Sequence, residues 1–364
     1  MKIIHCADIH LDAKMTANLG SARAAERRSE LLGTFHRMAE WAAEHDVAAI
    51  LIAGDLFDVK KISVTARNAV LSDIRRYPQI RFYYLRGNHD RDNFTDSIDE
   101  VPKNLQMFDT GWTYCTSGNV CICAAELTKE NADSIYSTLL LRPECFNIVM
   151  LHGQESPTSM KGREPVIDIK RLKNRGIDYL ALGHVHAYKR EQLDGRGIYC
   201  YPGCLEGRGF DECGPHGFVL LDIDESRGTF TDTFIPFAKR LLYEVPADVT
   251  GLCTSAEMAG AAARCLREAG CGPDDLVKLV LTGAVGADAE KDADYIRECF
   301  SDDYYFLKLC DETRLRVDER DYLLDESLKG EFVRLVIEQS GLSEEDQAAV
   351  IGYGLKALAG EKQL

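Results

Sequence analysis

The sequence lacks the features that would place it in a membrane or a secretory pathway. No apolar run approaches the roughly 20 residues that a membrane-spanning helix needs, although 45% of the residues are hydrophobic. The start, Met1-Lys2 followed by a short apolar stretch and a charged motif, has no signal-peptide pattern. There is also no internal repeat and no low-complexity tract. These absences predict a soluble globular protein without membrane contact.

The thirteen cysteines lack the spacings that mark a disulfide framework or a common zinc module. Their number is odd, they are scattered, and no pair has the spacing CxxC, so we expect a reducing, cytoplasmic setting. The tightest group is Cys200, Cys204, Cys213 and His216. A zinc site there is an alternative, although the spacing matches no common module.

The chain also lacks the positive charge that binding to nucleic acid usually requires, because its net charge is −16. The acidic surplus is uneven. Residues 1–240 carry 30 Lys and Arg against 33 Asp and Glu, whereas residues 241–364 carry 13 against 26. Several acids of the first part are also candidate metal ligands, whose charge cations would neutralise. The net charge therefore does not exclude a nucleic-acid substrate for residues 1–240.

What the sequence does contain is a series of short apolar runs that end abruptly in polar residues. The runs cover residues 2–7, 48–53, 82–85, 146–151 and 179–182, and each predicts a buried strand. Because parallel strands deliver their carboxyl ends to one edge of a sheet, the polar side chains there are candidate ligands. A single histidine at a strand end is more often structural, but five of the nine histidines lie in these segments. The candidates are Asp8, His10, Asp55, Asn88, His89, Asp90, His152, His184 and His186.

This series resembles the calcineurin-like metallophosphoesterase superfamily, whose motifs run D-x-H, GD, GNH(D/E), H and GHxH. All five occur here in that order, between residues 8 and 186. The resemblance implies an α/β (α+β) fold, a two-sheet β-sandwich flanked by helices. It also implies a centre of two divalent metal ions. The mixed donors suit Mn²⁺ best, with Fe²⁺ or Zn²⁺ as alternatives.

The resemblance also implies how the metal ligands are shared. Asp55 would bridge the two ions. One ion would take its other ligands from Asp8, His10 and His186, and the second ion from Asn88, His152 and His184.

The remaining polar residues of these motifs would act on the substrate. His89 would stabilise the transition state or protonate the leaving oxygen, as general-acid chemistry requires. Asp90 is expected to orient His89 through a hydrogen bond, with a simple turn residue as the alternative. Asp58 is either a second group of this kind or an organiser of its loop.

The wording of the motifs resembles the DNA-repair exonuclease branch, to which SbcD-type and YhaO-type proteins belong. The segments GDLFD, GNHD and GHVH, followed by YPG, carry this resemblance over residues 1–240. Asp12 departs from it, since SbcD-type proteins have glycine there, and this favours the YhaO-like side. The branch implies hydrolysis of DNA phosphodiester bonds, and basic residues would contact the phosphates. The candidates are Arg23, Arg27, Arg28, Lys60, Lys61, Lys161 and Arg163.

Two other functions stay open at this point. A small-molecule phosphodiesterase could use the same metal centre, although the length beyond residue 240 argues against it. A scaffold subunit without turnover is the non-enzyme alternative, although every expected ligand is present.

The sequence predicts three regions: a catalytic domain over residues 1–240, a small α/β capping domain over 241–318 and a helical tail over 319–364. Helical spacing predicts helices at residues 29–45, 64–77, 132–141, 169–176, 255–269 with Ser255 as N-cap, 289–300 and 326–339, and a last one after Ser343.

The tail is where the resemblance implies a partner. SbcD-type nucleases bind an SMC-like ATPase of the SbcC type through helices after the cap. Here Leu328, Phe332, Leu335 and Val336 would share one helix face that fits a groove. Alternatively, that face packs on the chain's own cap. The resemblance also implies a homodimer, without indicating its face.

Overall fold

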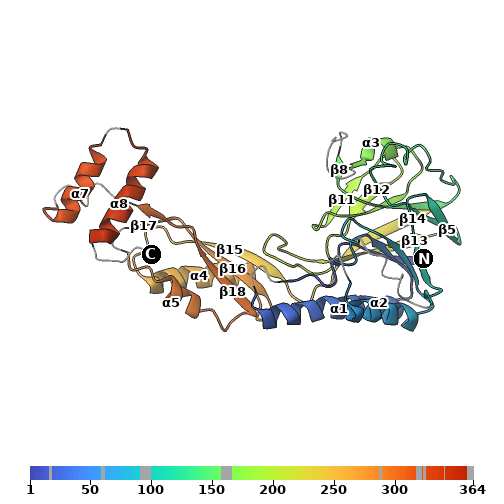
Figure 1. The fold of residues 1–364 in the computed structure, drawn as a ribbon, viewed down its shortest axis with the longest axis horizontal. Coiled ribbons are helices and arrows are strands. Elements are labelled where there is room, and N and C mark those ends of the chain that lie inside the picture. The colour runs from blue at the N-terminus through green and yellow to red at the C-terminus, as the bar shows by residue number, and fades with distance from the viewer. Residues whose placement is uncertain are drawn as a thin grey trace. The chain divides into compact units, whose positions relative to one another are not determined.

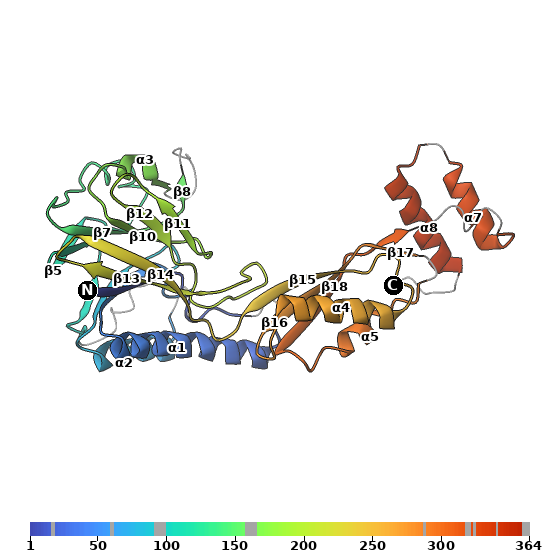
Figure 2. The same ribbon diagram turned by 180° about the vertical axis from the view of Figure 1, so that it is seen from behind.

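The structure is a computed structural model that describes residues 1–15, 19–58, 62–90, 100–156, 166–286, 289–316, 322, 325–339 and 341–358. Its contacts divide the chain into two compact units, Met1–Leu241 and Leu242–Leu364. Figures 1 and 2 show the elements of each unit from opposite sides. No described helix has both the length and the apolar character needed to cross a membrane.

Two six-stranded sheets form the N-terminal unit. The first has the order β14-β13-β1-β2-β3-β4, with strands Thr229–Pro236, Gly217–Asp224, Lys2–Cys6, Val47–Ala53, Arg81–Leu85 and Leu105–Met107. The second has the order β11-β12-β10-β7-β6-β5, with strands Lys189–Gln192, Ile198–Tyr201, Tyr179–Gly183, Phe146–His152, Val120–Ala124 and Thr113–Ser117. In both sheets the central strands run parallel, and antiparallel pairs lie toward the edges.

Apolar side chains cover both faces of these sheets. Alternate residues of β1 and β2, such as Ile3 and Leu51, face the second sheet, while Ile4 and Ile50 face the helices. Helices α1 (Ser21–Glu44) and α2 (Val64–Arg76) cover that outer face, which is clear in Figure 1. The short helix α3 (Ile169–Leu172) packs on the outer face of the second sheet, near the short pair β8 (Glu155–Ser156) and β9 (Ile167–Asp168). This two-sheet mixed α/β fold, with few helices, confirms the predicted fold class.

The C-terminal unit has a small sheet of its own. Strands β15 (Leu242–Asp248), β16 (Leu276–Thr282) and β18 (Phe306–Asp311) run parallel, and α4 (Ser255–Ala269) and α5 (Ala293–Glu298) pack on them. Strands β17 (Ala284–Gly286) and β19 (Arg314–Arg316) form a separate pair. Helices α7 (Leu328–Ile337) and α8 (Glu344–Leu358) share a small apolar cluster. Figure 2 shows α4 and α5 beside the three-stranded sheet.

Several predicted helices differ from the structure. Helix α3 ends at Leu172 and not at residue 176, and α5 covers only Ala293–Glu298 of the predicted range 289–300. Helix α1 begins at Ser21, eight residues before the predicted start at Ser29. Its buried stripe includes Arg27, a charged residue that an apolar pattern does not reveal. The helix predicted over residues 132–141 is a series of turns. There the Asn131 side chain bonds to the backbone of Thr128 and Glu126 instead, which competes with helical pairing.

In the C-terminal unit, α4 has the predicted bounds and ends at Gly270, whose φ of 73° suits glycine. Its N-cap is Thr254, not Ser255, because Thr254 and Glu257 form a reciprocal capping box. Along α7, Leu328 and Leu335 of the predicted face are exposed, whereas Val336 is buried together with Val333.

Candidate metal centre

All seven predicted metal ligands lie at the carboxyl ends of central strands in the N-terminal unit. The strands are β1, β2 and β3 of the first sheet and β7 and β10 of the second. The structure brings the seven side chains together in two neighbouring groups. The first group holds Asp8, His10 and His186, and the second holds Asp55, Asn88, His152 and His184.

In the first group two imidazole rings face each other. The Nε2 atoms of His10 and His186 lie 3.1 Å apart, and the rings meet edge to face. Both carboxylate oxygens of Asp8 accept a hydrogen bond from the backbone N–H of His184, at 3.0 and 2.9 Å. This bond joins the first group to the second. Asp8 and His10 are fully buried, so the protein holds their donor atoms in place.

In the second group the Asn88 side chain lies between two histidines. Its Oδ1 atom is 2.9 Å from Nε2 of His152 and 3.1 Å from Nδ1 of His184. Nε2 of His152 also lies 3.4 Å from Oδ2 of Asp55. The other nitrogen of His152, Nδ1, donates to the carbonyl oxygen of Ala53 at 2.9 Å. That bond leaves Nε2 of His152 to face the other donors of the group.

These distances fit groups that share an ion. Ligand atoms about 2.1 Å from one ion, at angles of about 90–110°, lie roughly 3.0–3.4 Å from one another. The contacts within the two groups span 2.9–3.4 Å. Imidazole, carboxylate and carboxamide donors suit Mn²⁺ or Fe²⁺ and, less exclusively, Zn²⁺. The residues present therefore fit a centre of two divalent ions.

The turns that carry these ligands have uncommon backbone conformations. The φ angles of Asp8, His10 and Asp55 are 50°, 51° and 51°, and that of His184 is 107°. Such conformations cost about 1–3 kcal/mol each and persist only where the surroundings hold them. Close packing also explains Gly54, where a Cβ atom would lie 2.0 Å from the His152 ring. Strained positions gathered in one place support a functional site.

His89 lies beside the first group and is held by Asp58. Its Nδ1 atom is 2.7 Å from Oδ1 of Asp58, and its ring meets that of His10 edge to face. The side chain of His89 is 46% exposed. The hydrogen bond to Asp58 raises the pKa of His89 above its ordinary value. An accessible imidazole with a carboxylate partner is suited to proton donation.

The expectation that Asp90 orients His89 is wrong. Asp90 is buried, and its carboxylate accepts hydrogen bonds from the backbone N–H groups of Leu56, Phe57 and Gly87. It therefore joins the turn after β2 to the turn after β3. Neighbours in a turn need not face the same way, and here one side chain points inward while the other is exposed.

Burial and neighbouring charges shift the acidities of the candidate ligands. Burial raises the pKa of Asp8 to about 6 and lowers that of His10 to about 3. Burial also opposes ionisation of Asp55, but its contacts with His152 outweigh this and hold the pKa of Asp55 below its ordinary range. The same contacts, again against burial, raise the pKa of His152 to about 9. An ionised Asp55 and a neutral His10 are the forms that bind metal ions, whereas His152 has to release a proton when an ion binds.

Two charged residues of the site were not predicted from the sequence. Arg208 and Glu212 lie in the loop between β12 and β13. Oε1 of Glu212 accepts from Nδ1 of His186 at 2.7 Å, and Nη1 of Arg208 lies 3.5 Å from Oδ2 of Asp58. Arg208 and Glu212 are four residues apart and follow the YPG segment. Nothing in that spacing indicates that they contact Asp58 and His186, which are distant in the sequence.

The alternative zinc site finds no support in the described part of the chain. None of the candidate ligand groups there includes a cysteine. Sγ of Cys204 lies 3.2 Å from Nδ1 of His216 in the interior, whereas Cys213 is exposed. All thirteen cysteines are free thiols.

Of the seven cations predicted to contact phosphates, three lie in the described part of the chain. The prediction for Arg27 is wrong, because this residue is buried and its guanidinium contacts Glu30 and Glu206. Arg23 is exposed and Arg28 half-buried on the same helix. The other four, Lys60, Lys61, Lys161 and Arg163, lie outside the described residues.

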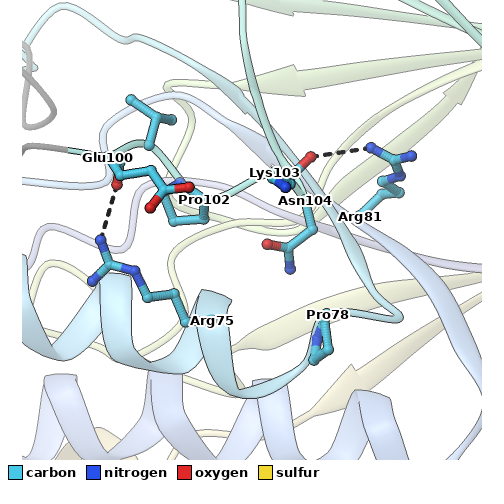
Figure 3. A pocket seen from close by; sticks show the side chains of 8 residues that line it. Arg75, Pro78, Arg81, Glu100, Pro102, Lys103 and Asn104 are labelled. Atoms are coloured by element: carbon cyan, nitrogen blue, oxygen red, sulfur yellow. Dashed lines mark hydrogen bonds between the residues drawn. The ribbon is translucent and has the colours of Figure 1, made fainter.

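A surface pocket lies away from the metal centre (Figure 3). It is lined by residues at the end of α2, the start of β3 and the approach to β4, among them Arg75, Arg81 and Lys103. Arg75 donates to the carbonyl oxygen of Glu100, and Arg81 to that of Lys103. The candidate ligands follow the opposite, carboxyl end of β3, so the pocket is no part of the centre.

The profile of the calcineurin-like phosphoesterase family matches residues 1–188, more than half of the 364 residues. The chain belongs to this family. The match spans every candidate ligand, and the family places the chain among the metallophosphoesterase hydrolases, whose members typically hold two metal ions.

Individual relatives point to one part of the family. "Uncharacterized metallophosphoesterase YhaO" of Bacillus subtilis is 28% identical over 240 residues, which cover 61% of this chain and 57% of that protein. "DNA double-strand break repair protein Mre11" of Methanopyrus kandleri is 26% identical over 264 residues, covering 62% of this chain and 54% of that protein. The chain thus spans little more than half of these relatives. The crystal structure of a dimetal phosphatase from Danio rerio aligns at 10% identity with a TM-score of 0.39, over 61% of this chain and 92% of that one.

Proposed function

We propose that this chain is a metal-dependent DNA nuclease that hydrolyses phosphodiester bonds with Asp8, His10, Asp55, Asn88, His152, His184 and His186 as metal ligands. The observation that carries the proposal is the joint placement of these seven donors beside the His89–Asp58 pair. A scaffold without turnover has no need of a complete set of this kind. We assign Mn²⁺ as the working ion, because the donor set suits it.

The proposed chemistry divides between the ions and the protein. When bound, two divalent ions supply a nucleophile at neutral pH and offset charge on the phosphoryl oxygens. Asp55, whose pKa is held below its ordinary range, would be one of their ligands. Asp58 accepts a hydrogen bond from Nδ1 of His89, and this bond favours the protonated ring. His89 would then donate its Nε2 proton to the leaving oxygen.

Two observations support DNA as the substrate. Relatives of this chain carry the name of a DNA double-strand break repair protein. The N-terminal unit is also close to neutral, with Arg23 and Arg28 on α1 as cations near its surface. We propose that such residues contact phosphates, which positions the duplex without reading its sequence.

The thirteen free cysteines support a reducing, cytoplasmic setting.

The two last helices support a protein partner. Leu328 of α7 and Tyr353 of α8 are 70% and 67% exposed, although Val333 and Ile351 pack between the helices. We propose that this apolar surface binds an SMC-like ATPase of the SbcC type, and that residues 1–240, 241–318 and 319–364 act as catalytic, capping and partner-binding regions. A homodimer is the other proposed assembly, and light scattering of the purified chain, alone and with such an ATPase, tests both.

The test of the function is hydrolysis of end-labelled double-stranded and single-stranded DNA with Mn²⁺. The wild type should degrade DNA, and His89→Ala should lose at least about 100-fold in rate while it still binds Mn²⁺. The matched control is His36→Ala, since His36 pairs with Asp73 between α1 and α2. That variant should cut DNA at the wild-type rate.

A second substrate separates the proposal from its rival. If the wild type hydrolyses a cyclic nucleotide but leaves every DNA end intact, the chain is a small-molecule phosphodiesterase and DNA is the wrong substrate. If it hydrolyses neither, alone or with an ATPase partner, the enzyme assignment itself is wrong.

A further inference from the structure

The loop between β12 and β13 holds a charged pair whose position at the metal centre gives it a role. The pair is Arg208 and Glu212. The carboxylate of Glu212 is buried and accepts from Nη2 of Arg208 at 2.8 Å and from the Arg208 backbone N–H at 2.8 Å. Its Oε1 atom also accepts from Nδ1 of His186 at 2.7 Å. One buried carboxylate therefore serves both an arginine and a proposed metal ligand.

The bond to Glu212 decides which nitrogen of His186 faces the metal centre. Nδ1 of His186 lies 2.7 Å from Oε1 of Glu212 and 3.0 Å from Nη2 of Arg208. A carboxylate only accepts hydrogen bonds and its contact is the shorter of the two, so we assign the proton to Nδ1. Nε2 then presents its lone pair, and this is the atom that lies 3.1 Å from Nε2 of His10. A histidine ligand needs its tautomer and its ring orientation fixed in this way.

Arg208 connects this arrangement to the proton donor. Its Nη1 atom lies 3.5 Å from Oδ2 of Asp58, and the other oxygen of Asp58 accepts from Nδ1 of His89. The guanidinium thus lies between two carboxylates, each of which holds one histidine of the site. A planar group with five N–H donors can satisfy both at once, whereas an ammonium group would meet them as a point charge.

The loop is fixed before any substrate arrives. Near its start, the backbone N–H of Cys204 donates to the carbonyl oxygen of His186 at 3.0 Å. Glu206 is buried and accepts from the hydroxyl of Thr34 and from the backbone N–H of Lys239, both at 2.6 Å. At its end, Nε2 of His216 donates to the carbonyl oxygen of Glu212 at 2.8 Å. Such anchoring keeps the charged pair in one geometry.

We propose that Glu212 is a positioning residue for the metal ligand His186, and that Arg208 couples it to the Asp58–His89 pair. The proposal rests on the metal centre described above but not on the identity of the substrate. It predicts that loss of the Glu212 carboxylate weakens one metal site and spares the other. The spared site is the second group, whose tautomers are set by other bonds, such as that of His152 to Ala53.

The test measures binding of Mn²⁺ alone to the full chain by calorimetry. In Glu212→Gln, one of the two binding steps should weaken about 10–100-fold, and the other should keep its wild-type affinity. The matched control is Asp178→Asn, because Asp178 is also buried and bidentate to an arginine, Arg196, at 2.7 and 2.9 Å. Asp178 precedes β10, at the end opposite the metal centre, so its variant should bind both ions as the wild type does.

The Mn²⁺-binding results test the role of Glu212 independently of whether the chain cleaves DNA. Unchanged binding at both steps in Glu212→Gln overturns it, and so does equal loss of both steps or an equal effect of Asp178→Asn. For Arg208, the substitution Arg208→Gln should leave both binding steps in place and lower kcat more than it changes KM, with partial recovery in Arg208→Lys. If the wild type binds two ions but no DNA is cut, the function is wrong while the binding result for Glu212 stands.

Discussion

At the scale of single residues, neighbours in space determine what each charged group does. Asp90 directly follows His89 in the sequence and Asp58 precedes it by 31 residues, yet only Asp58 contacts the His89 side chain. Asp90 binds three backbone N–H groups in the interior. Asp58 is therefore expected to affect catalysis and Asp90 to affect stability. Substitution of each by asparagine can measure the two effects separately.

Asp58→Asn should lower the rate of hydrolysis by about 100-fold or more, because the amide no longer holds His89 as a protonated donor. Its unfolding free energy should stay close to that of the wild type, since Asp58 is 25% exposed. Asp90→Asn should instead lose about 1–3 kcal/mol of stability, because an amide nitrogen would face backbone donors. Urea unfolding and rate assays on both variants check this. The reverse pattern would restore the role first expected for Asp90.

A buried ionic cluster should make stability depend on pH. Glu30 contacts Arg27, Lys239 and Arg240, and although burial opposes ionisation, these partners lower its pKa to about 2. A lowered folded-state pKa stabilises the protein above the unfolded pKa, and this contribution is lost as the pH falls. Glu30→Gln should therefore cost on the order of 3 kcal/mol at pH 7. The difference should shrink between about pH 5 and pH 2.

The matched control for that experiment is Glu26→Gln, one turn earlier on the same helix. Glu26 is half exposed and lies 3.5 Å from Arg240, so its replacement should cost less than about 1 kcal/mol. Urea unfolding of both variants across this pH range gives the comparison. A Glu30→Gln difference that is constant with pH would show that the cost comes from packing and not from charge.

At the scale of elements, the turns that follow the strands restrict which residues they accept as strongly as the buried strands do. Gly183 ends β10 where the backbone of β2 passes so closely that a Cβ atom would lie 1.9 Å from the Ala53 carbonyl oxygen. Asp12 shows the opposite case. It has a φ of 66°, in the region that favours glycine, and its carboxylate accepts from the N–H and hydroxyl of Ser63, the N-cap of α2.

Gly183→Ala should destabilise the N-terminal unit by about 3 kcal/mol or more, because the added methyl group forces the two sheets apart at the metal centre. The control is Gly195→Ala, where the added methyl group meets no atom within 4 Å. That change should be within about 0.5 kcal/mol of the wild type. Chemical unfolding measures both. A tolerated Gly183→Ala would mean that the close contact of the turns is not needed for folding.

At the scale of the whole molecule, two units of different charge are joined in one chain. The metal centre belongs entirely to the N-terminal unit, whereas most of the acidic surplus lies beyond residue 240. The buried carboxylate of Asp8 and its neighbour Asp55 disfavour each other's charge. Cations bound there should relieve this repulsion and stabilise the folded N-terminal unit.

Removal of metal should therefore lower the melting temperature of the chain and abolish hydrolysis. Mn²⁺ added back at about 100 times its dissociation constant should restore about 2.7 kcal/mol for each ion. Scanning calorimetry with chelator and with a Mn²⁺ series measures the effect. The control is His152→Gln, which lacks one ligand and should respond more weakly. A melting temperature independent of Mn²⁺ in the wild type would contradict the proposed centre.

Much of this architecture follows from local sequence. Apolar runs of strand length that end in Gly, Asp, Asn or His predict buried parallel strands with their polar ends at one edge, and the structure places all seven candidate ligands there. Helix α4 follows from its spacing in the same way. These features depend on residues close together in the chain, and local conformation and side-chain period carry that information.

Only the tertiary structure decided which charges meet. Nothing near Arg27 in the sequence shows that it is buried against Glu206, nearly 180 residues away, and nothing near Glu212 shows that it holds His186. A charged residue in a sequence has the pattern of an exposed one, because its partner can come from any other segment. Sequence alone therefore determined the family, the strands and the candidate donors. The fold decided the partners of those donors, since electrostatic pairing depends on distance in space and not on separation along the chain.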